Sequence, residues 1–273
     1  MIAGSIVFIH VPKTGGSTFA SILRRSFPAS DVVLQSALKE KYLAEVDAQL
    51  RAAAMRPQLG SIHGHVPLSY RPQFPPEARY VTLLRDPVRR QYSHYRWVYT
   101  RAVQNGSAPP VAEALKRGRL VDNLQTRMLC GLDNPLTRPA DDELLTAARA
   151  ELDRLAFVGI VERFPESMLL AQERLGLRHV AYRRRNVRGT SHALEDVEAL
   201  RAHNLLDLEL YAHATALVEA DLDRLRPQAV ALARADEAMS ARRLVADRAA
   251  LGYVADYSVS AVGARIRRAL AWR

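Results

Sequence analysis

The sequence predicts an α/β fold with a central parallel sheet, made of one α/β domain over residues 1–225 and a helical C-terminal extension over residues 226–273. Three observations predict this class. Short apolar runs alternate with segments of helical periodicity, loops rich in glycine or proline separate several of them, and no internal repeat is present. A chain of 273 residues is long enough to bury a substantial core.

The predicted strands are short runs of β-branched and other apolar residues. Such runs suit strands that are buried on both faces of a sheet covered by helices. The strands are expected at residues 5–10, 62–66, 80–84 and 157–161, with a further one at 179–182.

The predicted helices follow from apolar spacing and from signals at their ends. Asp86 and Pro87 mark a helix start, because aspartate is a good N-cap and proline suits the first helical position, and Gly176 ends a later helix. The helices are expected to begin near residue 17 and to cover 36–55, 87–101, 111–117, 123–129, 141–154 and 165–175, with mostly helix after residue 194.

The segment 5–27 joins the first strand to the first helix through a loop that suits an anion. Adjacent glycines allow a ligand to approach the backbone, hydroxyl side chains add donors, and the positive end of the helix dipole faces the same point. A lysine precedes the glycines, whereas it follows them in the G-x-x-x-x-G-K-[ST] loop of nucleotide triphosphatases. An ordinary strand-to-helix turn is the alternative interpretation. The residues concerned are Lys13, Thr14, Gly15, Gly16, Ser17 and Thr18.

A second anion site is predicted at the end of another strand. Arg85 leaves that strand, and Ser93 follows eight residues later, in the second turn of the next helix. A guanidinium can bind a phosphate with two hydrogen bonds while a hydroxyl supplies another donor. Both predicted sites follow strands of one parallel sheet, so we expect them at the same edge. A surface helix with incidental arginines is the alternative.

Two histidines lie between these sites, at His63 and His65. Residues two apart on an extended segment project to one face, so both imidazoles can point into one cleft, and Gly64 between them would leave room for a substrate. Histidine suits the abstraction of a proton from a hydroxyl near neutral pH. The alternatives are one packed and one surface histidine, or a metal pair, although no further ligand at metal spacing lies nearby.

The composition narrows the class of partner. A net charge of +10 favours an anionic partner, which could be a nucleotide, an acidic glycan, a nucleic acid or a membrane surface, or else a basic solvated surface. The single cysteine, Cys130, excludes an internal disulfide and a cysteine zinc site. The first apolar run stops at His10, too early for a signal peptide or a membrane span, so we expect a cytoplasmic protein.

Three stretches in combination, VPKTGGSTF, HGHV and LRDPVRRQYSHY, resemble a family of carbohydrate sulfotransferases. This family includes the heparan sulfate and uronyl 2-O-sulfotransferases and their bacterial relatives. The similarity continues more weakly through NLQTRMLCG, VGIVERFPESMLLAQERLGL and residues 186–211, and so spans most of residues 5–220. It implies a P-loop-like three-layer fold, 3′-phosphoadenosine 5′-phosphosulfate (PAPS) as co-substrate, no metal, and a carbohydrate or glycolipid acceptor without a nucleic-acid partner.

The resemblance also implies which residues bind the nucleotide. The loop from Thr14 to Thr18 would hold the 5′-phosphosulfate, and Lys13 would neutralise the bridging oxygen as it leaves. Arg85 and Ser93 would hold the 3′-phosphate. Arg188 would close over the nucleotide from a late loop.

For the chemistry itself, the resemblance implies that His65 is the general base. His63 would lie close to the transferring sulfuryl group or orient the acceptor. Lys13 would complete the catalytic group by stabilising the departing nucleotide.

Two other functions stay open on the residues alone. A P-loop-like nucleotide kinase would need Mg²⁺ and an acidic ligand after a strand, for which Asp86 is the candidate beside a strand end. A nucleic-acid or membrane-surface binding protein would use the basic excess, and residues 258–273 predict an amphipathic, arginine-rich helix suited to peripheral membrane contact. We expect that helix to pack on the domain or on a partner subunit instead.

Overall fold

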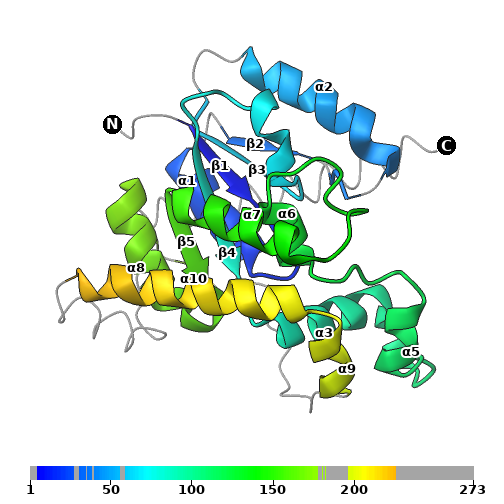
Figure 1. The fold of residues 1–273 in the computed structure, drawn as a ribbon. Coiled ribbons are helices and arrows are strands. Elements are labelled where there is room, and N and C mark those ends of the chain that lie inside the picture. Colours follow the sequence, from blue (N-terminus) through cyan, green and yellow to red (C-terminus); the bar gives the residue numbers. More distant parts are fainter. Residues whose placement is uncertain are drawn as a thin grey trace.

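The computed structural model describes residues 5–27, 31–34, 36–38, 40–55, 59–177, 180, 182 and 196–225. Within them, five strands form one sheet in the order β2-β3-β1-β4-β5, with every neighbouring pair parallel. The strands are β1 (Ile6–Ile9), β2 (Asp31–Val33), β3 (Ser61–Gly64), β4 (Arg79–Leu84) and β5 (Phe157–Ile160). Helices flank the sheet (Figure 1), which confirms the predicted α/β class.

The central strand is β1, whose continuous apolar run suits a strand covered on both faces. All four of its residues are at most 1% exposed, so the apolar run is buried on both faces. Ile6 pairs in register with Ser61 of β3 on one side and with Arg79 of β4 on the other. The chain therefore passes from the β2–β3 side of β1 to the β4–β5 side, and ligands of such sheets bind at the carboxyl ends of the strands near this reversal.

The strands predicted at 5–10, 62–66, 80–84 and 157–161 are confirmed as β1, β3, β4 and β5, with small shifts at their ends. The edge strand β2 was not predicted, because it has three residues and begins with an aspartate. The strand predicted at 179–182 is wrong for the part that the structure describes, since Val180 and Tyr182 have no regular secondary structure.

The helices follow the predicted order with differences at several ends. Asp86 caps α3 by accepting a hydrogen bond from the amide of Arg89 (2.8 Å), and the left-handed Gly176 ends α8, as predicted. The helix predicted at 36–55 begins only at Leu43, after a 3₁₀ turn at 40–42. The helices are α1 (Gly16–Ser26), α2 (Leu43–Ala54), α3 (Pro87–Val98), α4 (Thr100–Gln104), α5 (Val111–Lys116), α6 (Leu124–Leu129), α7 (Asp142–Arg154), α8 (Phe164–Leu175), α9 (Val197–Ala202) and α10 (Leu205–Asp223).

The described residues form two apolar cores. The main core surrounds the sheet and includes Cys130, which packs as a small apolar residue with Met128 and Leu129, as expected. The second core lies in a helical lobe made of α3, α4, α5 and α9, at the lower right of Figure 1, and is rich in tyrosines. None of the helices described has both the length and the apolar character needed to span a bilayer. The predicted extension 226–273 lies outside the described residues.

Candidate functional site

The first predicted anion loop lies between β1 and α1. Lys13 has a left-handed backbone (φ 74°), which is unusual for a residue with a side chain. The buried Thr14 donates its hydroxyl to the carbonyl of Val11 (2.8 Å), so its side chain braces the loop. Helix α1 begins without a side-chain cap and has no acidic residue in its first turn. Its amides and the positive end of its dipole are thus directed at the loop, where an anion would be stabilised.

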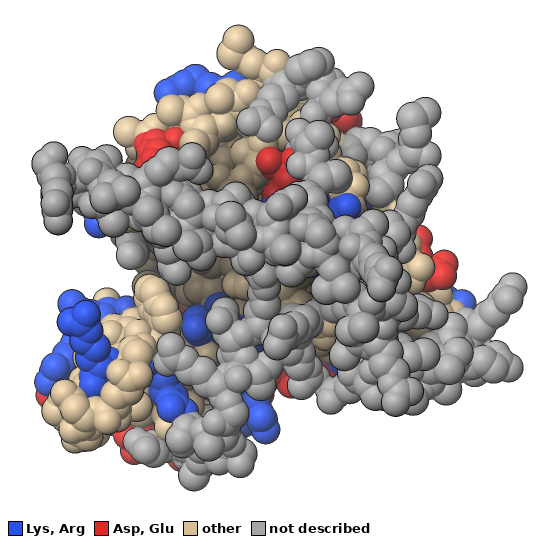
Figure 2. Space-filling model, turned by 180° about the vertical axis from the view of Figure 1, so that it is seen from behind, with Lys and Arg blue, Asp and Glu red and all other residues tan. Residues whose placement is uncertain are grey.

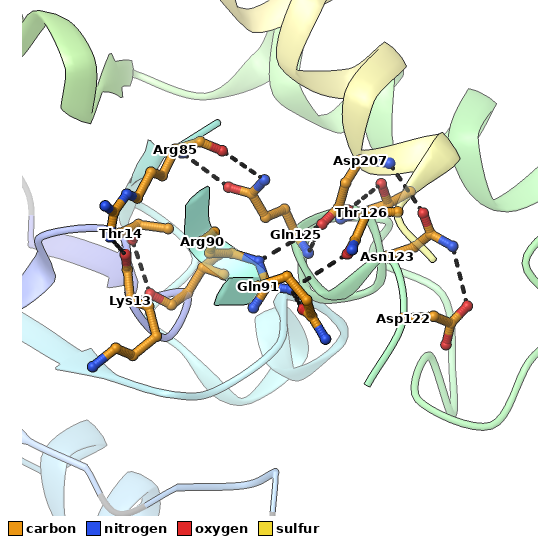
Figure 3. A network of polar contacts seen from close by, with 12 residues as sticks. Lys13, Thr14, Arg85, Arg90, Gln91, Asp122, Asn123, Gln125, Thr126 and Asp207 are labelled. Carbon is orange, nitrogen blue, oxygen red and sulfur yellow. Dashed lines mark hydrogen bonds and ion pairs between the residues drawn. The ribbon is translucent and has the colours of Figure 1, made fainter. Parts of the chain in front are cut away.

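The second predicted site meets the first through Arg85. Its Nη1 donates to the carbonyl oxygen of Lys13 (3.2 Å), so the loops after β1 and β4 are directly joined (Figure 3). The Nε of Arg85 is buried and has no hydrogen-bond partner among the described residues. Burial lowers the pKa of the guanidinium from its usual value. Ser93 lies in the second turn of α3 and is partly exposed.

A carboxylate that the sequence did not single out also lies at this second site. Glu162, which follows β5, places Oε1 3.8 Å from the Nε of Arg85. Its Oε2 accepts hydrogen bonds from the amide of Asp86 (3.2 Å) and from the hydroxyl of Tyr211 (3.0 Å). Glu162 therefore neutralises part of the positive charge of Arg85, and an anionic ligand would have to displace or outweigh it.

The two predicted histidines have different surroundings. His63 is only 4% exposed, and its Nε2 lies 3.1 Å from Oδ2 of Asp31 and 3.4 Å from the guanidinium of Arg24. Burial favours a raised pKa for Asp31, but its hydrogen bond and charge interaction with His63, with help from Ser61 and Arg24, bring the pKa below its usual value. His63 therefore lies in a buried polar cluster, whereas His65 is partly exposed.

Gly64 has a different role from the one expected. A Cβ at this position would lie 2.8 Å from the Cβ of Leu34 and 3.0 Å from its carbonyl oxygen. A side chain does not fit at this position, because the backbone just after β2 lies directly against β3. Packing against Leu34 thus gives a reason for Gly64 that the sequence did not show, and room for a substrate stays a prediction.

A backbone carbonyl just after β1 holds His65 in one tautomer. Its Nδ1 lies 2.6 Å from the carbonyl oxygen of His10. A carbonyl oxygen can only accept, so Nδ1 carries the hydrogen, and a neutral His65 has its lone pair on Nε2. The rings of His10 and His65 are in contact, with centroids 4.3 Å apart.

His10 ends the first predicted strand, and its contacts with His65 also make it part of the site. Burial, followed by the charges of His65, His63 and Lys13, lowers the pKa of His10 well below its usual value. This residue is therefore neutral at pH 7. Its ring also lies against α1, because a Cβ built on Gly16 would be 2.0 Å from the imidazole.

The contact between Gly16 and His10 leads to a prediction on stability. Gly16→Ala should lower the free energy of unfolding by about 1–3 kcal/mol, because the added methyl group must displace a packed ring. Urea unfolding measures this change. In the His10→Ala background the same Gly16→Ala change should cost much less, since the atoms that the methyl group meets are gone. An equal loss in the two backgrounds would contradict the contact.

A further histidine, His94 on α3, lies in the stretch LRDPVRRQYSHY, and the sequence alone predicts no role for it. Its ring lies beside Trp97 (centroids 5.9 Å apart), and the Nζ of Lys13 lies 5.9 Å from the centroid of the same indole. Burial, then the charges of Arg90, Lys13 and His65, lowers the pKa of His94 to about 4. Burial is the main cause of both low pKa values, and the positive charges nearby, which add to it, suit an anionic ligand.

The depressed pKa of His94 has a consequence for stability in acid. Between pH 6.5 and about 4 the unfolded chain binds a proton at this residue that the folded chain does not. Stability should therefore fall as the pH falls through this window, by roughly 1 kcal/mol for this residue between pH 7.5 and pH 5.5. His94→Phe should make that fall shallower by this amount in urea unfolding. An unchanged difference between the two pH values would contradict the assignment.

The structure thus brings Lys13, Arg85 and His65 to one edge of the sheet. Arg188 lies outside the described residues, and within them no group of three or more His, Cys, Asp or Glu side chains is placed to hold a metal. The expectation of a metal-free reaction stays a prediction. No protein-family model matches this chain, and no curated protein has a significantly similar sequence, so the family resemblance also stays a prediction.

Proposed function

We propose that the protein is a sulfotransferase that moves a sulfuryl group from PAPS to a hydroxyl of a carbohydrate or glycolipid. The observation that carries this proposal is the hydrogen bond from Arg85 to the carbonyl of Lys13. Through this bond the lysine–glycine loop and Arg85, which we propose as the phosphate ligand, lie side by side at the carboxyl edge of a parallel sheet. The strand order 2-3-1-4-5 is compatible with the P-loop-like three-layer sulfotransferase fold that the resemblance implies.

The described residues fit the two charged ends of such a nucleotide. At the first loop, the uncapped start of α1 and the exposed Ser17 offer donors for the 5′-phosphosulfate, with Lys13 as the mobile charge. At the second, the buried Nε of Arg85 is a donor without a hydrogen-bond partner among the described residues, and a 3′-phosphate oxygen would satisfy it. Ser93 would supply a further donor from α3.

The proposed base is His65. Its Nδ1 hydrogen bond to the backbone of His10 leaves Nε2 as the basic atom, which is the tautomer that proton abstraction needs. His63 is held by Asp31 and Arg24 in a buried cluster, and we assign it a supporting role in placing the segment that carries His65.

The reaction would be an in-line displacement. The acceptor oxygen forms a bond to sulfur while the bond between sulfur and the bridging oxygen of the nucleotide breaks. The hydroxyl proton moves to Nε2 of His65, and adenosine 3′,5′-bisphosphate leaves with the bonding electron pair. Lys13 and the amides of α1 stabilise the negative charge that develops on the leaving oxygen.

The distribution of basic residues favours an acceptor that carries negative charge. Figure 2 shows Lys and Arg side chains gathered over the helical lobe, at the lower left in that view. Exposed basic residues of this lobe include Arg89, Arg101, Lys116, Arg117 and Arg119. An acidic carbohydrate could bind there beside the reaction centre.

A transfer assay tests the proposed reaction. Incubation with PAPS labelled with ³⁵S and a mixture of cell polysaccharides and glycolipids should place label in carbohydrate, and Lys13→Ala should reduce the rate. If the protein instead moved ³²P from Mg·ATP into the same mixture and transferred no ³⁵S, the sulfotransferase proposal would be wrong and the kinase interpretation right.

A further inference from the structure

The backbone amide and the backbone carbonyl of Arg85 are both hydrogen-bonded by one side chain, that of Gln125. Gln125 of α6 accepts a hydrogen bond from the amide of Arg85 through Oε1 (3.0 Å) and donates one from Nε2 to its carbonyl oxygen (2.9 Å). Gln125 is fully buried. Its amide therefore pairs with the residue just beyond β4 much as a neighbouring strand would, and it fixes where the Arg85 side chain begins.

Gln125 is in turn held by a buried carboxylate. Asp207 of α10 accepts hydrogen bonds from the amides of Gln125 (3.1 Å) and Thr126 (2.8 Å), and from the hydroxyl of Thr126 (2.8 Å). The Nε of Arg90 lies 3.9 Å from the same carboxylate. Figure 3 shows these residues as one connected group between α3, α6 and α10. Such a network limits the positions open to Gln125.

The buried network contacts the segment between β4 and α3 at two points. Arg85 and Arg90 are five residues apart, on either side of the start of α3, and both ends of this short segment contact the same buried group. The guanidinium of Arg85 extends from the fixed backbone to the carbonyl of Lys13. A shift of the Arg85 backbone would therefore move the guanidinium relative to the first loop.

We infer that Gln125 is a positioning residue that sets selectivity for a 3′-phosphate on the bound nucleotide. The inference rests on the proposed function, because it assigns the 3′-phosphate to Arg85. Gln125 does not touch the ligand in this arrangement. It acts by holding Arg85 at the separation from the Lys13 loop that a nucleotide with phosphates at both ends requires.

Two variants separate this role from simple support of the fold. Gln125→Met keeps the length of the side chain and removes both hydrogen bonds to Arg85. The matched control is Gln91→Met, since Gln91 is also fully buried in the network, but its side chain contacts Arg90 and not Arg85. Both changes should lower the melting temperature, and only the first should alter nucleotide selectivity.

The experiment is a calorimetric titration with adenosine 3′,5′-bisphosphate and with adenosine 5′-monophosphate. The wild type should prefer the bisphosphate. In Gln125→Met the ratio of the two Kd values should fall at least tenfold, with the affinity for the monophosphate kept within about threefold, and Gln91→Met should keep the wild-type ratio. Gln125→Leu, which also lacks both polar groups, provides the same measurement should Gln125→Met not fold.

The outcomes distinguish the inference from the proposal beneath it. A wild type without preference for the bisphosphate would overturn the proposed function. A wild-type preference that persists unchanged in Gln125→Met or Gln125→Leu would overturn the role of Gln125 alone. An equal loss of selectivity in Gln91→Met would also overturn it, because the effect would then be a general consequence of a weakened network.

Discussion

Asp207→Ala should lower the free energy of unfolding by about 3–5 kcal/mol, the cost typical of removing one partner of a buried ion pair. Asp207 is fully buried and accepts three hydrogen bonds at the start of α6. Burial lowers the pKa of Arg90 only to about 10, so the guanidinium stays charged at neutral pH and would be left without its carboxylate. The melting temperature should fall by on the order of 10 °C.

An exposed ion pair provides the matched control for this prediction. Glu113 and Arg117 form an i,i+4 pair on α5 with about half of each side chain exposed to solvent. Glu113→Ala should leave the melting temperature nearly unchanged, because exposed pairs contribute little. Calorimetric melting of both variants decides the matter. Similar small losses in the two variants would show that the Arg90–Asp207 contact does not hold α3 to α10.

His65→Ala should reduce turnover by ~10²–10⁴-fold with little change in nucleotide affinity, because a general base acts on the acceptor proton and not on nucleotide binding. Single-turnover transfer of ³⁵S from PAPS measures the rate, and calorimetry with adenosine 3′,5′-bisphosphate measures the affinity.

The control for His65 is a histidine outside the site, His203, which lies on the helical lobe. His203 also hydrogen-bonds a backbone carbonyl through its ring, from Nε2 to Leu120 (2.8 Å), but it lies on the α9 side of the lobe. His203→Ala should keep the wild-type rate. If His63→Ala lost turnover in a folded protein while His65→Ala kept it, the base would be His63, and the assignment made from the His65 tautomer would be wrong.

Much of the fold could be predicted from local signals. The apolar runs of β1, β4 and β5 are buried on both faces, which is the condition under which a strand shows as a continuous apolar segment. Asp141 caps α7 by accepting from the amide of Leu144 (3.0 Å), as its place before a helical pattern indicates. Strand β2 gave no such signal, because it is short and begins with a charged residue, Asp31. The contacts of Asp31 with Ser61 and His63 form only in the folded chain.

The candidate site could be predicted only where its residues follow strands. The positions of Lys13 and Arg85 after β1 and β4 were enough to expect them at one edge. Gln125 lies 40 residues from Arg85 and Asp207 a further 82 away, so no spacing rule connects the three. His10 and His94 were missed for the same reason, since their low pKa values come first from burial and then from charges brought near them by the folded chain.

The sulfotransferase proposal is tested most directly by the melting temperature of the wild type and of Arg85→Ala with either adenosine 3′,5′-bisphosphate or ADP plus Mg²⁺. Ligand at a hundred times its Kd adds about 2.7 kcal/mol, a rise of several degrees for a chain of this size. We expect the bisphosphate alone to stabilise the wild type, and Arg85→Ala to lose that effect. Stabilisation by ADP with Mg²⁺ alone, or by neither ligand, would contradict the proposal.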